Sequence, residues 1–286
     1  MTGSQETRKL LSVIPEPVPV ADALRLSGVE GERIDECVQR GFLELVADRV
    51  AFRHDLIRRA VESSLVDYER RSKFRVVLVG LPEETHPCLL IHCAREVDDV
   101  DRLLDLAPRS ARYAAATGSH VQAAEDFREV GPHLDRIEPA ERAQLLDEWA
   151  REEYLLDDIG EAIRLNGLAC ADYRERGDNV AESRAMAQRA HYFDVAGDSS
   201  EAESLGRAAI EILGPNPSGE DLARALEVNA YLHTMAGNTE AVPGLVERTL
   251  EAGGPGLDEV VLIRSLNHRG TAANLAAYPA GRDSLE

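Results

Sequence analysis

The spacing of apolar residues along the chain changes near Phe52–Ala60. Before this stretch the apolar runs are short and are closed by glycine or proline, whereas after it they keep a helical spacing. The upstream part predicts helices over residues 20–26 and 30–40, followed by a hairpin with strands over 42–46 and 50–53. We therefore expect a small mixed module first and helices alone after it.

Helix, helix and hairpin in this order are typical of a winged-helix module, which often binds DNA through its second helix. The second expected helix, 30–40, has Glu30, Glu32, Asp35 and Glu36 against two arginines. A helix that enters the major groove should be basic. The sequence therefore predicts no direct binding of nucleic acid by this chain.

Downstream of the module, a small-residue turn and a following alanine recur. The pairs are Gly118 and Ala124, Gly160 and Ala162, Gly197 and Ala202, and Gly237 and Ala241. The alanines are 38, 40 and 39 residues apart, which is near the spacing of stacked helix pairs. This period predicts a helical repeat array.

Larger apolar residues follow three of these alanines at i+3, and further alanines follow two of them at i+7, so that they share one stripe of a helix. They are Phe127, Leu165 and Leu205, with Ala169 and Ala209. Small residues on such a stripe allow a neighbouring helix to approach closely. Amphipathic partner helices are expected over 141–158, 181–196, 220–236 and 259–277.

The expected fold class is therefore mainly α: a small winged-helix module with one β-hairpin, followed by a tetratricopeptide-like α-solenoid of antiparallel helix pairs. The expected domains are 1–80 for the module, 81–108 for connecting helices and 109–286 for the repeats. One more interval after Ala241 ends at Ala280, so a new helix should begin there. We expect the last repeat to be truncated and its uncapped edge to favour self-association.

The 286 residues have a formal net charge of −20, and the excess lies in one part of the chain. Residues 1–80 have 13 basic and 13 acidic residues, whereas residues 81–286 have 19 and 39. Such an acidic body repels phosphate backbones. The sequence has no apolar segment of membrane-spanning or signal-peptide type, and its four cysteines are typical of reduced thiols, so a cytoplasmic protein is expected.

Six basic residues cluster after the hairpin, namely Arg58, Arg59, Arg70, Arg71, Lys73 and Arg75. They would either dock against acidic repeats or a further domain, or form a solvated helix face. Just before them, Asp55 is expected to cap the helix that begins there. Capping and packing at this junction would account for His54 and Asp55 without any bound ligand.

Cys88 and His92 have the i, i+4 spacing of two metal ligands on one helix face. A tetrahedral site needs further ligands, and neither Cys37 nor Cys170 has a partner at a suitable spacing, so no metal site is expected. The sequence also has no phosphate loop, nucleophile elbow or His-Glu-x-x-His helix. We therefore expect no enzymatic activity and no catalytic residues.

Several short segments have a family resemblance when they are taken together. They are residues 41–43 (Gly-Phe-Leu), 50–61 with His54-Asp55 at their centre, the pair 70–71, 90–94 (Leu-Ile-His-Cys-Ala) and 108–114 (Pro-Arg-Ser-Ala-Arg-Tyr-Ala). This set resembles the middle portion of the large ATP-dependent LuxR-type transcriptional regulators, related to the maltose regulator and to the signal-transduction ATPases with numerous domains.

The resemblance implies an N-terminal nucleotide-binding domain, a winged helix, a tetratricopeptide-like array that senses a signal, and a C-terminal DNA-binding helix-turn-helix. It also implies that His54, beside Asp55, senses bound ATP or ADP in a full-length protein. The present sequence has neither a Gly-x-x-x-x-Gly-Lys-Ser/Thr loop nor a terminal helix-turn-helix. We therefore expect a segment of a longer protein that holds no cofactor by itself.

Three functions stay open at this point. The first is the sensing segment of a transcriptional regulator, which binds a small-molecule inducer or a protein or peptide partner on the array. The second is a free-standing adaptor of tetratricopeptide type, and the third is a DNA-binding winged helix with an oligomerising tail. The acidic second helix argues against the third.

Overall fold

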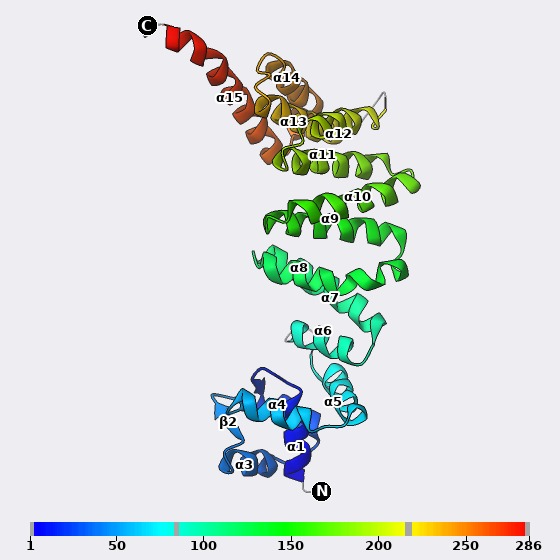
Figure 1. The fold of residues 1–286 in the computed structure, drawn as a ribbon, viewed down its shortest axis with the longest axis vertical. Coiled ribbons are helices and arrows are strands. Elements are labelled where there is room, and N and C mark those ends of the chain that lie inside the picture. Colours follow the sequence, from blue (N-terminus) through cyan, green and yellow to red (C-terminus); the bar gives the residue numbers. More distant parts are fainter. Residues whose placement is uncertain (1–2, 83–85, 215–218, 284–286) are drawn as a thin grey trace. The chain divides into compact units, whose positions relative to one another are not determined.

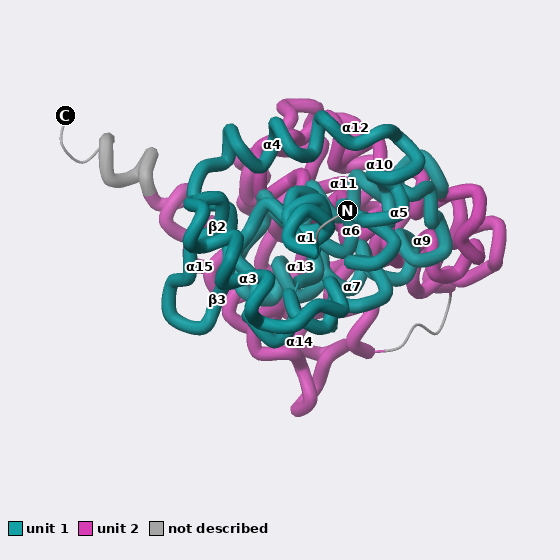
Figure 2. The backbone as a smooth tube through the Cα atoms, turned by 90° about the horizontal axis from the view of Figure 1, so that it is seen from below, with its two compact units in different colours: residues 1–133 teal, residues 134–286 magenta. Residues whose placement is uncertain are grey.

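The computed structural model describes residues 3–82, 86–214 and 219–283 (Figure 1). Within these ranges the chain is mainly α, with 15 α-helices and one small antiparallel sheet of three strands. The predicted fold class is confirmed. The chain divides into two compact units, residues 1–133 and 134–286 (Figure 2). The predicted division at residues 80 and 108 stays a prediction.

The N-terminal module consists of short helices and a small sheet. Its elements are α1 (Gly3–Ser12), β1 (Val18–Pro19), α2 (Val20–Ser27), α3 (Gly31–Gln39), β2 (Leu43–Val46), β3 (Arg49–Phe52), α4 (Asp55–Ser63) and α5 (Asp67–Gly80). The predicted helices and hairpin are confirmed, and α2 ends at Gly28, where φ is +60°. The strand order is β1-β3-β2, so that Val50 of β3 faces both Val18 and Leu45.

Two elements of this module were not expected from the sequence. The helix α1 buries Leu10 and Leu11, and the segment behind it buries Val13 and Ile14. The strand β1 has only two residues, and its Pro19 lies at the sheet edge, where a missing N–H does not interrupt a ladder. Both elements close the core of the module over β3.

The rest of unit 1 is helical. It consists of α6 (Pro87–Glu96), α7 (Val100–Ala116) and α8 (His120–Val130), and the 3-10 helix η1 (Gly131–Arg136) follows. The buried faces of these helices include Leu90, Ala111 and Phe127. This part therefore has the apolar stripe that the repeat predicts at Ala124 and Phe127.

Unit 2 consists of successive antiparallel helices (Figure 1). They are α9 (Pro139–Leu155), α10 (Ile159–Glu175), α11 (Asn179–Val195), α12 (Ser199–Glu211), α13 (Gly219–Met235), α14 (Val242–Gly253), the 3-10 helix η2 (Gly254–Gly256) and α15 (Glu259–Asp283). The four predicted partner helices correspond to α9, α11, α13 and α15. Ala162, Leu165 and Ala169 on α10, and Ala202 and Ala209 on α12, are buried as predicted.

Glycines with a positive φ occupy four of the turns between helices, at Gly118, Gly177, Gly197 and Gly237. Two of these turns continue with an N-cap aspartate: Asp178 accepts a hydrogen bond from the backbone N–H of Ala181, and Asp198 accepts one from that of Glu201. The turn glycine predicted at Gly160 is wrong. Gly160 lies inside α10, and Asp157 has the positive φ of that turn, +67°.

Two boundaries differ from the prediction. The helix expected over 141–158 ends at Leu155, because the chain turns at Asp157. A new helix was expected near Ala280, and this expectation is wrong for the described residues. There α15 continues through Asp283 as one helix of 25 residues.

Candidate functional site

A row of aromatic and imidazole rings crosses unit 2 from helix to helix. It consists of Tyr154 on α9, His191 on α11, Tyr231 on α13 and His268 on α15, and we call it the ring ladder. Successive ring centroids are 5.3, 4.9 and 5.7 Å apart. Each ring is partly exposed. Such distances are those of favourable tilted and edge-to-face ring pairs.

Hydrogen bonds fix the orientation of these rings. The Tyr154 hydroxyl oxygen lies 2.9 Å from Nε2 of His191, and the Tyr231 hydroxyl donates to Asp194 at 2.7 Å. Nε2 of His268 lies 3.0 Å from a carboxylate oxygen of Glu227. A polar contact therefore joins each successive pair of these helices, in addition to the packing of the rings.

Sequence reasoning missed the ring ladder, although the chain holds a signal for it. The four positions are 37, 40 and 37 residues apart, close to the interval between the repeat alanines. Residues at equivalent places in stacked helix pairs come to lie side by side. Because tyrosine and histidine alternate, no single residue type recurs, and a search for recurring alanine does not find them.

A groove lies beside the ring ladder on the same four helices. It has a volume of about 420 Å³ and is lined in part by Asp147 and Arg151 of α9, Gln188 of α11, Val228 of α13 and Arg264 of α15. The last four precede Tyr154, His191, Tyr231 and His268 by three or four residues, which is one helical turn. The groove and the ladder are therefore neighbouring parts of one continuous surface.

Most charged groups that line the groove are already paired. Arg184 forms an ion pair with Asp221 at 2.6 Å, and Arg224 pairs with Glu220 at 2.7 Å. In contrast, Arg151 and Arg264 form no ion pair with any residue that the structure describes. Both residues are exposed to solvent.

The titration of the ladder rings is shifted by their surroundings. Burial lowers the pKa of His191, which favours its neutral form. Burial and the hydrogen bond to Asp194 raise the pKa of Tyr231 above its usual range. Burial also raises the pKa of Asp147, whose carboxylate accepts a hydrogen bond from Asn166 at 2.8 Å.

His54 and Asp55 lie at the start of α4. His54 is the N-cap residue with an extended backbone, and its side chain is exposed. The prediction that Asp55 caps α4 is wrong. Asp55 is the first helical residue, and its carboxylate pairs with Arg58 at 2.7 Å and with Arg59 at 2.6 Å. The hydrogen bond from Arg58 lowers the pKa of Asp55. Nucleotide sensing by His54 stays a prediction.

The predicted basic cluster is engaged within unit 1. Arg58 is buried and donates to the carbonyl oxygen of Ser12 at 2.8 Å. Three further cations bridge to acidic residues on neighbouring segments, namely Arg70 to Glu96, Arg71 to Asp98 and Lys73 to Glu6. These pairs join α5 to α1 and to the end of α6. Docking of a partner at Arg58, Arg59, Arg70 and Arg71 stays a prediction, and Arg59 has the most exposed of the four side chains.

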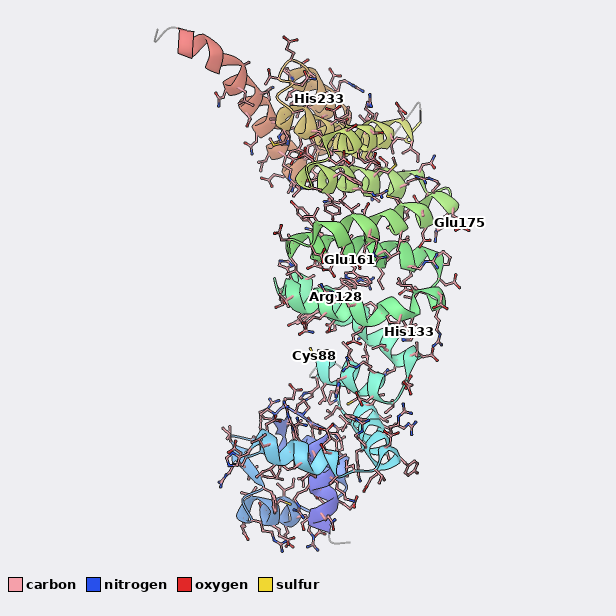
Figure 3. The ribbon with its side chains drawn as sticks, in the orientation of Figure 1. Cys88, Arg128, His133, Glu161, Glu175 and His233 are labelled. Carbon is pink, nitrogen blue, oxygen red and sulfur yellow. The ribbon has the colours of Figure 1, made fainter. Side chains whose placement is uncertain are left out.

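Cys88 and His92 lie on α6, with Cys88 near its start (Figure 3). Nδ1 of His92 lies 3.1 Å from the Arg95 guanidinium, and its ring contacts Phe74 edge-on. The other three cysteines are buried, and burial raises the pKa of Cys93 and of Cys170 to about 12. Among the described residues there is no group of three or more side chains placed to hold a metal ion.

None of the helices in the described ranges combines the length and the apolar character that crossing a membrane requires. No protein-family model matches the sequence, and no curated protein matches it.

Three solved structures illustrate what the fold is similar to. A signal-transduction ATPase with numerous domains and a tetratricopeptide repeat sensor from Pyrococcus horikoshii aligns over 97% of this chain, with 13% identity and a TM-score of 0.49. Two structures of a Podosopora anserina kinesin light chain with nearly identical TPR-like repeats align over 68% of this chain and 90% of theirs, with 16% and 15% identity and TM-scores of 0.46 and 0.45. The chain spans about half, 48%, of the Pyrococcus protein.

Proposed function

We propose that the chain is the signal-sensing and protein-interaction segment of a LuxR-type transcriptional regulator. In this proposal the helical array binds an inducer or a partner, and the module of residues 1–80 is a winged helix that relays binding to a nucleotide-binding domain outside the chain. The ring ladder with its groove is the observation that carries the proposal.

The ladder and the groove suit a sensing role because they are built from four helices. A molecule bound there contacts α9, α11, α13 and α15 together, so its binding energy depends on how these helices stack. A ligand with differential affinity for two stacking arrangements shifts the equilibrium between them. Binding in the groove would therefore change the array as a whole.

The N-terminal module supports a relay in preference to DNA reading. Its order of short helices and strands is typical of a winged helix, but both arginines of the α3 region, Arg33 and Arg40, pair with Glu36. The exposed His54 at the start of α4 is available to a neighbouring domain, which would hold ATP or ADP in a full-length protein. The proposal assigns no catalytic residue and no resident cofactor to this chain, and it places the protein in the cytoplasm.

A free-standing adaptor of tetratricopeptide type is the alternative. The groove has charged and apolar lining, and an adaptor would use this mixture to hold a peptide. Both functions use the same surface. They differ in whether binding changes transcription.

The coding sequence on both sides of this segment tests the proposal first. A phosphate loop upstream and a helix-turn-helix downstream, both in frame, are expected for a regulator. If both are absent, a role as part of such a regulator is excluded, and the adaptor function remains.

A transcription reporter tests the role of the groove in the complete regulator. Tyr231→Ala removes one ring of the ring ladder. The reporter signal on induction should then fall, while the level of the regulator in the cell stays the same. Tyr113→Ala on α7 is the matched control, because Tyr113 is 72% exposed and lies in unit 1. Equal reporter signals for the two variants would contradict a sensing role of the groove.

A further inference from the structure

We infer that the groove beside the ring ladder binds a small ring-bearing molecule with a carboxylate, which Arg151 and Arg264 hold from two sides. This inference rests on the proposed function and deepens it, since it names the ligand class of the same groove. It commits to a small molecule, and a peptide ligand is an outcome of the test.

The two arginines are distinguished from the other cations of the groove. Arg184 and Arg224 are neutralised by Asp221 and Glu220, whereas Arg151 and Arg264 have no ion-pair partner in the described part of the chain. They come from α9 and α15, the first and the last of the four helices that line the groove. A guanidinium offers a planar fork of N–H donors that matches a carboxylate.

The groove also has five carboxylates, and each of them has a partner among the described residues. Asp221 and Glu220 pair with arginines, Glu227 contacts His268, and Asp147 accepts from Asn166. The remaining one, Glu148, accepts from the Gln144 amide at 2.9 Å. The groove has five carboxylates and four arginines, and the amide hydrogen bonds leave the formal charges of Asp147 and Glu148 in place. Arg151 and Arg264 are the two arginines of the groove whose guanidinium donors no ion pair among the described residues occupies, so these donors are open to a ligand carboxylate.

The rest of the lining suits a ring. Val228, Val260, Val261 and Ala187 supply apolar surface, and His191 and Tyr231 lie one turn further along their helices. Aromatic rings gain from offset and edge-to-face contacts with other rings. The volume of about 420 Å³ falls in the range of pockets that hold small molecules, about 300–1,000 Å³.

Binding of a matched pair of probes to the purified chain tests this inference. The probes are 2-naphthoate and 2-naphthamide, which share the ring and differ in charge. Ligand-observed NMR titration gives the dissociation constant of each probe. The carboxylate should bind about tenfold more tightly than the amide, and added salt should reduce this difference.

Arginine variants locate the site. In Arg151→Gln/Arg264→Gln the preference for the carboxylate should disappear, whereas Arg207→Gln/Arg248→Gln should keep it. The control pair removes the same charge from exposed positions on α12 and α14, which do not line the groove. Equal affinity for the two probes in the wild type, no binding of either probe, or an equal loss in both variants would overturn the inference.

The outcomes separate this inference from the proposed function. If an acidic peptide binds and loses affinity in Tyr231→Ala while 2-naphthoate does not bind, the small-molecule site is refuted and protein interaction by the groove is supported. If 2-naphthoate binds as expected while the flanking sequence lacks the regulator domains, the ligand class stands and the regulator does not.

Discussion

The hydroxyl oxygen of Tyr154 lies 2.9 Å from Nε2 of His191, and the centroids of the two rings are 5.3 Å apart. The ring of Tyr231 is a second neighbour of the imidazole, with a centroid distance of 4.9 Å. The charged groups near it are Asp194, Arg264 and Glu227, and burial outweighs their effect, so that the pKa of His191 is lowered. His191 therefore prefers to be neutral inside the folded array.

This shift predicts how the stability of unit 2 depends on pH. Because the folded pKa of His191 is lower than the unfolded value of about 6.5, the unfolded state binds more protons below that pH. The stability that His191 contributes is therefore present above pH 6.5 and is lost as the pH falls through the folded pKa. Urea unfolding at about pH 7.5 and pH 5.5 should show a smaller loss for His191→Asn than for the wild type. An equal loss of stability in the two proteins would show that protonation of His191 is not its cause.

The close approach of α12 and α13 predicts an unusual response to a glycine substitution. A Cβ at Gly206 would lie 2.9 Å from Cδ1 of Leu232 and 3.1 Å from Oδ1 of Asn229, whose amide donates to the Gly206 carbonyl oxygen. Gly206→Ala should lower the free energy of unfolding by about 1–3 kcal/mol, although alanine is the better helix former. Urea denaturation measures this change.

Gly270→Ala on α15 is the matched control for that substitution. No atom lies within 4 Å of a Cβ built at Gly270, so helix propensity alone should act there and raise the stability by about 0.5–1 kcal/mol. Opposite signs are expected for the two variants. A stabilising effect at both positions would show that α12 and α13 are not held as closely as the structure places them.

The sequence predicted those parts of the fold that depend on local spacing. The hairpin, the buried alanines of α10 and α12, and the four long partner helices follow from periodicity, which burial on one face enforces. The turn at Asp157 escaped prediction because aspartate adopts the left-handed conformation that glycine has at the neighbouring turns. The strand β1 has two residues and depends on its pairing with β3 across the module, which no local pattern shows.

The candidate site was less predictable, because it depends on contacts between repeats. His54 was singled out by a family resemblance and the arginines by their clustered charge. The ring ladder arises only when Tyr154, His191, Tyr231 and His268 are brought together by stacking. The charge of the basic cluster was visible in the sequence, but its pairing with acids on α1 and α6 was not.

Arg58 and Arg59 are adjacent in sequence, but their replacement by alanine is predicted to change the stability of the protein by different amounts. Arg58 is buried, and it bonds the Ser12 carbonyl oxygen and Glu62, so Arg58→Ala leaves both groups without this donor and should cost about 2 kcal/mol. The side chain of Arg59 is 69% exposed, and Arg59→Ala should change stability little. Thermal or urea unfolding of both variants checks this contrast. A similar loss in both would mean that the bond to Ser12 contributes little.

Thiol chemistry should single out Cys88. Cys88 is exposed, whereas Cys37, Cys93 and Cys170 are buried. Partial burial raises the pKa of Cys88 as well, but deep burial raises that of Cys93 and of Cys170 to about 12. A thiolate is the reacting form, so the buried thiols should react only after unfolding. Labelling of the folded protein with a maleimide, read by mass spectrometry, should give mainly one adduct, and Cys88→Ser should remove it. Rapid labelling at a second cysteine would contradict the burial.

Exposed apolar side chains on α15 predict that the chain associates with itself. Ile263 and Leu266 are 50% and 39% exposed and lie three residues apart, so they share one side of the helix. Apolar side chains that gather on one face gain free energy when a second surface covers them. Light scattering at increasing concentration should show a rising mean mass for the wild type, and Ile263→Glu/Leu266→Glu should stay monomeric. The control Val121→Glu changes an apolar residue of α8 that is 59% exposed in unit 1, and it should associate as the wild type does. A wild type that stays monomeric throughout the concentration series would show that α15 is not an interface.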